Sequence, residues 1–182
     1  MPCFSKTLDT FVAVGALFAL ALVGNYRALS ASVDPWKALA FLEGTWEAHS
    51  QAGSAGAQSD GRYTFKPELK HHVLVRGSEA YAACKGPATF DCKHNDLLYV
   101  YQEAENEPLR AIYFDNEGHV IHYNVSTPGS NTAIFTSEAS QSGPQFQLVY
   151  ERKGAVMSGK FQMRMPGQAE WKSYLEWSGA KR

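Results

Sequence analysis

Hydrophobic and polar residues alternate along most of this chain, in short runs that are separated by turn-forming residues. In the run 145–153, Phe146, Leu148 and Tyr150 fall on one side of an extended backbone and Gln147 falls on the other. This alternation predicts β-strands with one buried and one solvated face. Ten such runs follow one another, at 45–51, 62–69, 71–84, 96–104, 109–115, 119–127, 131–139, 145–153, 156–165 and 171–179.

The connections between these runs are short and rich in Gly, Pro, Asn and Ser. Such turns join antiparallel neighbours, because a parallel connection needs a longer crossover. An open meander of this length would expose two unpaired edges, which closure removes. The pattern therefore predicts an all-β fold, an antiparallel up-and-down β-barrel of about ten strands, as one domain over 32–182.

One short helix is predicted before the strands, within 34–44. Asp34 is a suitable N-cap, and Pro35 fits the first helical turn. Gly44 can end the element.

Residues 1–31 have the pattern of a signal peptide. The segment from Phe11 to Gly24 carries no charge, and it is shorter than the roughly 20 apolar residues of a membrane span. Ala28 and Ser30 offer the small residues of a cleavage site. The alternative is an uncleaved anchor, since the positive flank is weak. Both interpretations predict export, to the periplasm or outside the cell, and only the anchor predicts a membrane partner.

Charge and cysteine content narrow the class of protein further. The formal net charge is -1 and there is no basic run, so nucleic acid is not an expected partner. Cys3 lies in the leader, whereas Cys84 and Cys92 form an even pair in the domain. In an oxidising compartment this pair predicts a disulfide. A two-cysteine metal half-site is the alternative, and it lacks a second pair.

The segment 111–125 gathers Asp115, Glu117, His119 and His122, which suggests a metal site, an acid–base pair or a hairpin turn. In a strand the two histidines point to opposite faces, because their spacing is odd. A hairpin turn in which Gly118 adopts a positive φ explains the pattern without chemistry. The turn is the favoured interpretation, no metal site is predicted, and no catalytic residue is assigned.

Two kinds of polar residue could nevertheless face the barrel interior. His122 points outward if Ile121 and Tyr123 pack inward, and otherwise it lines the lumen. Arg76 and Arg110 each lie among apolar strand residues. A buried arginine must be paired and could anchor a ligand carboxylate, whereas an outward-facing arginine needs no ligand.

The helix, followed by Gly44 and Trp46 and then by strands alone, resembles the opening of the lipocalin and fatty-acid-binding-protein superfamily, the calycins. This resemblance implies that Trp46 closes one end of the barrel beneath a basic residue from the far end of the chain, Lys181 or Arg182. Segments 109–123 and 174–177 resemble uncharacterised bacterial lipocalin-like proteins of the DUF1579 type, and that likeness implies no activity.

Segment 41–47 is similar to the nitrobindins, a haem-binding calycin branch. Their haem iron is held by a histidine close to the C-terminus. No histidine follows His122 in this chain, which argues against haem, so no cofactor is predicted.

These observations together predict an exported, lipocalin-like barrel that binds a small apolar or amphipathic molecule in its interior. One alternative is an enzyme, an isomerase or hydrolase acting on a barrel-bound molecule through His122 or Arg110. The other is a filled structural or interaction barrel without a ligand. The predicted ligand-binding residues are Trp46, Tyr63, Phe65, Tyr101, Arg110, His122, Phe161, Met163, Leu175 and Trp177.

Overall fold

The computed structural model describes residues 34–50, 56–80, 84–88, 90 and 92–182. The predicted signal peptide or anchor, 1–31, lies outside the described residues. No helix in the described ranges is long and apolar enough to cross a membrane.

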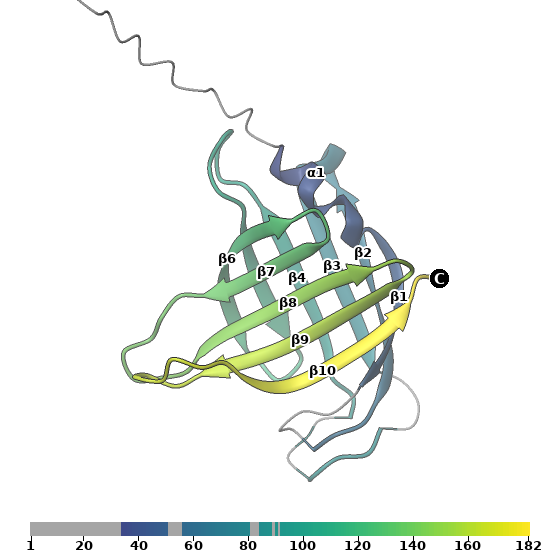
Figure 1. Ribbon diagram of the computed structural model, residues 1–182, viewed down its shortest axis with the longest axis vertical. Helices are drawn as coiled ribbons and strands as arrows, with labels where there is room; N and C mark the ends of the chain where they lie inside the picture. The colour runs from purple at the N-terminus through teal and green to yellow at the C-terminus, as the bar shows by residue number, and fades with distance from the viewer. Residues whose placement is uncertain (1–33, 51–55, 81–83, 89, 91) are drawn as a thin grey trace, which may run out of the picture. The chain divides into compact units, whose positions relative to one another are not determined.

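Ten antiparallel strands form a closed barrel, in which each strand pairs with the next and β10 pairs with β1 (Figure 1). The predicted fold class is therefore confirmed. The strands are β1 (Gly44–Ser50), β2 (Asp60–Glu68), β3 (Val73–Ala80), β4 (Asn95–Tyr101), β5 (Arg110–Asp115), β6 (Val120–Gly129), β7 (Thr132–Ser137), β8 (Gln145–Lys153), β9 (Val156–Arg164) and β10 (Lys172–Ala180).

The turn between β2 and β3 begins earlier than the hydrophobic pattern indicates. Leu69, Lys70 and His71 all have positive φ and form the short 3₁₀ segment η2 (Leu69–His71). Left-handed backbone cannot continue a strand ladder. The predicted run 62–69 therefore ends as a strand at Glu68, and the run from 71 begins at Val73.

The predicted helix is α1 (Pro35–Leu39), extended by η1 (Ala40–Leu42). The Asp34 side chain accepts a hydrogen bond from the backbone N–H of Trp36, at 3.0 Å, so the predicted N-cap is confirmed. Leu39 and Leu42 are buried in the core. In Figure 1, α1 lies at one end of the barrel.

Trp46 is buried close to this end, and its indole N–H donates to the Leu42 carbonyl at 2.8 Å. The Lys181 ammonium lies 5.5 Å from the Trp46 ring centroid, so Lys181 is the basic residue expected above the tryptophan. Gly44 makes room for it, because a Cβ there would lie 2.4 Å from Lys181 Cε. Arg182 instead forms an ion pair with Glu47.

Aromatic side chains of the inner faces fill the middle of the barrel. Tyr150 is fully buried and packs against Tyr63, Phe65, Phe135 and Trp177, with ring centroids 5.2–6.1 Å apart. Offset and edge-to-face contacts of this kind add to the stability gained from burial alone. This core supports the walls of the cavity that occupies the rest of the interior.

Candidate ligand-binding cavity and its polar rim

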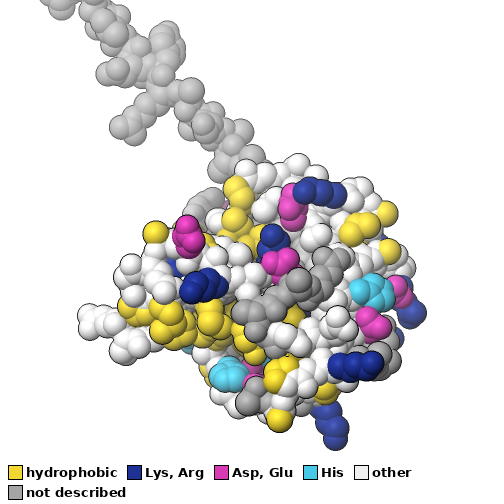
Figure 2. Space-filling view, turned by 60° about the horizontal axis from the view of Figure 1, so that its bottom comes forward, with side chains coloured by type: hydrophobic (Ala, Val, Ile, Leu, Met, Phe, Trp, Pro, Cys, Tyr) yellow, Lys and Arg dark blue, Asp and Glu magenta, His cyan; other side chains and the backbone are white. Residues whose placement is uncertain are grey.

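A cavity of about 720 Å³ lies inside the barrel. Its lining comes from the ends of β1, β3, β5 and β9, the starts of β2, β4, β6, β8 and β10, and the adjoining turns. In an antiparallel meander these ends share one side of the barrel, opposite α1 (Figure 1). Figure 2 turns this side forward and shows hydrophobic side chains gathered on it, with charged side chains around them.

One wall of the cavity is apolar and aromatic. Phe146 and Phe161 stack with their ring centroids 5.6 Å apart, and Tyr174 meets Phe161 edge-on. Met163 and Leu175 extend this wall, and all five side chains are only half-buried. The apolar surface that they leave open would gain free energy if a bound molecule covered it.

Trp177 also lines the cavity, and its indole lies against Gly159 on the neighbouring strand. The two residues are register partners of β10 and β9. A Cβ on Gly159 would lie 2.1 Å from Cε2 of the indole. The glycine therefore sets the orientation of the tryptophan in the cavity.

The opposite wall carries a buried ion pair. Arg76 on β3 donates from Nη1 to Oδ1 of Asp96 on β4, at 2.5 Å, and both side chains are buried. The guanidinium also lies 5.4 Å from the Tyr63 ring centroid, within range of a cation–π contact. Arg76 Nε has no hydrogen-bond partner among the described residues.

Five residues at the mouth of the cavity form what we call the polar rim: His94, Tyr113, Asp115, Glu117 and His119. His94 Nε2 and the Tyr113 hydroxyl are 3.0 Å apart, and that hydroxyl donates to Asp115 Oδ2 at 3.2 Å. The same Asp115 oxygen lies 2.8 Å from His119 Nδ1. The second nitrogen of His94, Nδ1, faces Glu117 Oε1 at 3.5 Å. All five side chains line the cavity.

Asp96 links the ion pair to the polar rim and keeps its charge. Burial alone would raise the pKa of Asp96, but the Arg76 guanidinium and the hydrogen bond with His94 hold it below its usual range. The hydrogen bond to Asp96 in turn raises the pKa of His94, against the effect of burial. Burial strongly raises the pKa of the Tyr113 hydroxyl, which keeps it protonated.

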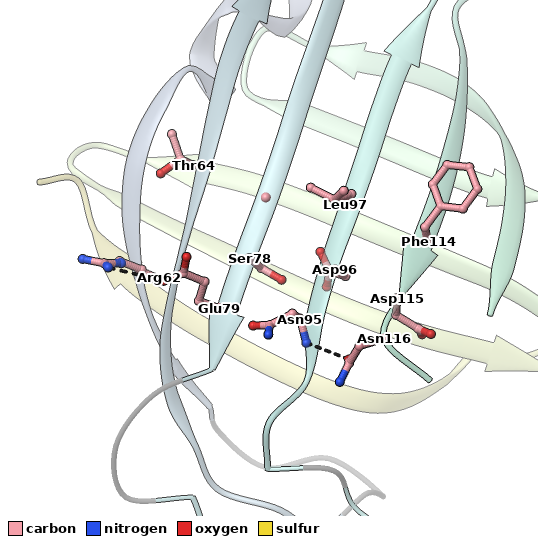
Figure 3. Close-up of a pocket in the computed structure, with 11 residues that line it drawn as sticks. Arg62, Thr64, Ser78, Glu79, Asn95, Asp96, Leu97, Phe114, Asp115 and Asn116 are labelled. Atoms are coloured by element: carbon pink, nitrogen blue, oxygen red, sulfur yellow. Dashed lines mark hydrogen bonds and ion pairs between the residues drawn. The ribbon is translucent and has the colours of Figure 1, made fainter. Parts of the chain in front are cut away.

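The β5–β6 hairpin places the acidic side of the polar rim. Oδ1 of Asp115 accepts the backbone N–H groups of Glu117 and His119, at 3.0 and 2.9 Å. Gly118 has φ +89°, as the predicted turn requires. Asn116 accepts the backbone N–H of Asn95 at 2.9 Å and ties the turn to β4 (Figure 3).

The predicted disulfide between Cys84 and Cys92 is confirmed, with a Cα–Cα distance of 5.6 Å. It joins two positions within the β3–β4 connection, and Cys92 lies two residues before His94. Phe90 lies between the two cysteines and lines the cavity. The disulfide therefore limits the movement of one side of the cavity mouth.

A second hollow, of about 740 Å³, lies at the ends of β2 to β5 and is more open to solvent (Figure 3). Thr64, Leu97 and Phe114 border it on the outer sheet face, where Gly77 contributes no side chain. It has fewer apolar walls than the interior cavity. The interior cavity is therefore the better candidate for a binding site.

The structure divides the ten residues predicted to bind a ligand into three groups. Five of them line the cavity: Tyr63, Phe161, Met163, Leu175 and Trp177. Trp46 and Phe65 are almost fully buried in the core. Tyr101 alternates with the buried Val100, and so it lies on the other face of β4.

Arg110 and His122 are the remaining two, and both face away from the interior. Arg110 alternates with the buried Ala111 and pairs with Glu138 at 3.1 Å. His122 is exposed, because Ile121 and Tyr123 beside it face inward. Neither side chain lines the cavity, so the enzyme alternative loses the two residues first suggested for it.

Sequence reasoning did not identify the ion pair or the place of His94. Arg76 stood out as an arginine among apolar residues, but nothing showed which face it takes. Asp96 lies on the same face of β4 as Leu98 and Val100, which are buried. The signal that could have found the pair is an acidic residue at an inward position on the strand next to that of an inward-facing arginine.

No family model matches this chain, and no curated protein matches it either. The fold and the site define a closed, ten-stranded antiparallel β-barrel with an interior cavity. This architecture is compatible with a lipocalin-like fold.

Proposed function

We propose that this protein binds a small amphipathic molecule inside the barrel. The observation that carries the proposal is the cavity of about 720 Å³, with one aromatic wall and one polar wall. Binding pockets for small molecules commonly enclose about 300–1,000 Å³ and combine apolar walls with a few polar groups. A cavity of this size disfavours the alternative of a filled structural barrel.

Unpaired polar atoms support a ligand that carries a hydrogen-bonding group. Arg76 Nε, the Tyr63 hydroxyl and Trp177 Nε1 are buried, and they make no hydrogen bond within the described part of the chain. All three residues line the cavity. Leaving a buried donor unsatisfied costs about 1–3 kcal/mol, so an acceptor atom of a ligand or an ordered water would stabilise this wall.

The experiment is a titration with two fluorescent probes, neutral N-phenyl-1-naphthylamine and anionic anilinonaphthalene sulfonate. We expect saturable binding of at least one probe. Leu175→Trp fills the apolar wall and should weaken binding at least tenfold. Leu97→Trp is the matched control, because Leu97 is exposed on the outer face and should leave binding unchanged.

Two results would contradict the proposal: no saturable binding of either probe, or equal weakening by both tryptophan variants. The second result would point to the outer hollow that Leu97 borders. Native mass spectrometry of protein from its own host would then identify any molecule that copurifies.

Catalysis on a bound molecule is the second candidate function, and one observation favours it. His94 and Tyr113 place a histidine and a protonated hydroxyl side by side at the cavity mouth, 3.0 Å apart. Such a pair can exchange protons with a bound substrate. Once a copurifying molecule is known, chemical change of that molecule by wild type but not by Tyr113→Phe would support this alternative.

The proposed place of action is an exported compartment. The disulfide supports this, because disulfides persist in oxidising compartments. The calycin relationship is likewise part of the proposal and is supported by the contact of Lys181 with Trp46. N-terminal sequencing of the exported protein should find a start near residue 32, and recovery only from the cytoplasm would contradict export.

A further inference from the structure

Three potential metal ligands meet at the polar rim from two separate parts of the chain. His94 precedes β4, whereas Asp115 ends β5 and Glu117 lies in the following turn. One nitrogen of His94, one oxygen of Asp115 and one oxygen of Glu117 all lie within 4.8 Å of one another. We propose that these three residues bind a divalent transition-metal ion at the mouth of the cavity.

The charges of the rim favour a cation. Asp115 and Glu117 have no lysine or arginine partner within the described ranges, and the titratable side chains that face them are His94, His119 and Tyr113. The nearby carboxylate of Asp96 is already neutralised by Arg76. Two carboxylates in a partly enclosed mouth thus lack a fixed positive charge, which a metal ion would supply.

The surroundings of His94 have the arrangement that supports a metal-binding imidazole. Nε2 is held by the Tyr113 hydroxyl at 3.0 Å and lies 3.4 Å from Asp96 Oδ2. Asp96 is fixed in turn by Arg76. Nδ1 remains on the side of Glu117. In metal sites, the nitrogen that does not bind the ion commonly donates to a carboxylate, which orients the ring and makes it a better ligand.

The three ligand atoms must move slightly closer together to hold an ion. Bonds of about 2.0–2.2 Å from Zn²⁺ place neighbouring ligand atoms of a tetrahedral site about 3.3–3.6 Å apart. His94 and Glu117 already satisfy this at 3.5 Å. Asp115 must approach the other two, and its Oδ2 would exchange a hydrogen bond with Tyr113 or His119 for the ion.

The ligand set indicates which ions fit. A mixture of imidazole nitrogen and carboxylate oxygen suits Zn²⁺, Mn²⁺ or Fe²⁺ better than an all-oxygen ion such as Ca²⁺. Three protein ligands leave at least one coordination position for water or for a donor atom of a molecule in the cavity. The site therefore adds a possible second anchor for a ligand, although metal binding itself does not require that the cavity be filled.

The test uses the full domain after dialysis against a chelator, with calorimetric titration of Zn²⁺. Co²⁺ binding is followed by its visible absorption, which reports coordination geometry. We expect one ion per chain, and Glu117→Gln should weaken binding by at least about tenfold. His94→Gln should do the same. His122→Gln is the matched control, since that histidine is exposed on the same barrel outside the rim, and binding should be unchanged.

Absence of saturable binding at one ion per chain would overturn the proposal, and so would wild-type affinity in Glu117→Gln. Equal weakening by His122→Gln would assign the ion to scattered surface histidines. Glu117 is an exposed turn residue whose side chain forms ion pairs, among the described residues, with His94 and His119 alone, so its substitution should leave the melting temperature of the metal-free protein unchanged. Probe binding repeated in chelator separates failure of this site from failure of the cavity.

Discussion

Arg76 and Asp96 form an ion pair inside the barrel, with Nη1 2.5 Å from Oδ1 and only 7% of each side chain exposed. The pair runs diagonally between β3 and β4, because Arg76 is the register partner of Leu98 and Asp96 that of Ser78. It supports the polar wall of the cavity, and Asp96 also orients His94. One contact thus connects the stability of the barrel to its candidate site.

Removing the cation should therefore be costly. Arg76→Met leaves the Asp96 charge buried without its partner, and we expect the free energy of unfolding to fall by about 3–5 kcal/mol. The double variant Arg76→Met/Asp96→Leu should recover most of this loss, because it removes both buried charges. Urea unfolding of the three proteins measures both effects. A loss below about 1 kcal/mol in the single variant would show that the pair is not buried as described.

Gly159→Ala should disturb the cavity by displacing Trp177. The new Cβ would lie 2.1 Å from the indole, so the ring must swing away from the strand into the open space. We expect a loss of about 1–3 kcal/mol in stability, weaker probe binding and altered tryptophan fluorescence. Gly129→Ala is the matched control, because a Cβ at Gly129 meets nothing within 4 Å. Equal behaviour of the two variants would contradict the described packing.

Gly179→Ala should weaken closure of the barrel between β1 and β10. A Cβ at this position would lie 1.8 Å from the Glu47 carbonyl oxygen, and backbone cannot move aside as a flexible side chain can. We expect a loss of more than about 3 kcal/mol. Thermal unfolding, together with amide exchange of β1 and β10, would locate the effect. Wild-type protection of these strands in the variant would argue against such a close approach.

Stability should decline at alkaline pH through buried tyrosines. Burial raises the pKa of Tyr63 from its ordinary value of 10.0 to about 12. Between these values the unfolded chain loses the proton and the folded chain retains it, so this contribution to stability is fully present well below pH 10 and is lost as the pH rises from about 10 to about 12. Tyr63→Phe should reduce this loss by about 1 kcal/mol between about pH 9 and pH 11. Identical pH profiles for both proteins would contradict the burial of this hydroxyl.

Reduction of the Cys84–Cys92 disulfide should destabilise the domain by about 2–3 kcal/mol, because it releases a short closed loop in the unfolded chain. The variant Cys84→Ser/Cys92→Ser should match the reduced wild type in thermal unfolding. It should also bind the fluorescent probes more weakly, since Phe90 within the loop lines the cavity. If a reductant leaves the wild-type melting temperature unchanged, the disulfide does not stabilise the fold.

The sequence by itself determined the strands, most of the turns and the class of fold. Alternation such as that of Phe146, Leu148 and Tyr150 is a local property, since successive side chains of any strand point to opposite faces. Turn residues such as Gly118 act within a few positions, and Cys84 and Cys92 lie close along the chain. These signals required no knowledge of distant neighbours.

Only the tertiary structure decided where the chemistry lies. The alternation of side chains along a strand placed His119 and His122 on opposite faces. It could not show that His94, which precedes Tyr113 by 19 residues, would reach the same hairpin. That meeting depends on the register between β4 and β5, where Asp96 pairs with Asp115. Barrel closure likewise decides that the Arg76 side chain faces the interior and that the Arg110 side chain faces away from it. Closure assigns one face of every strand to the interior, a choice that each strand alone leaves open.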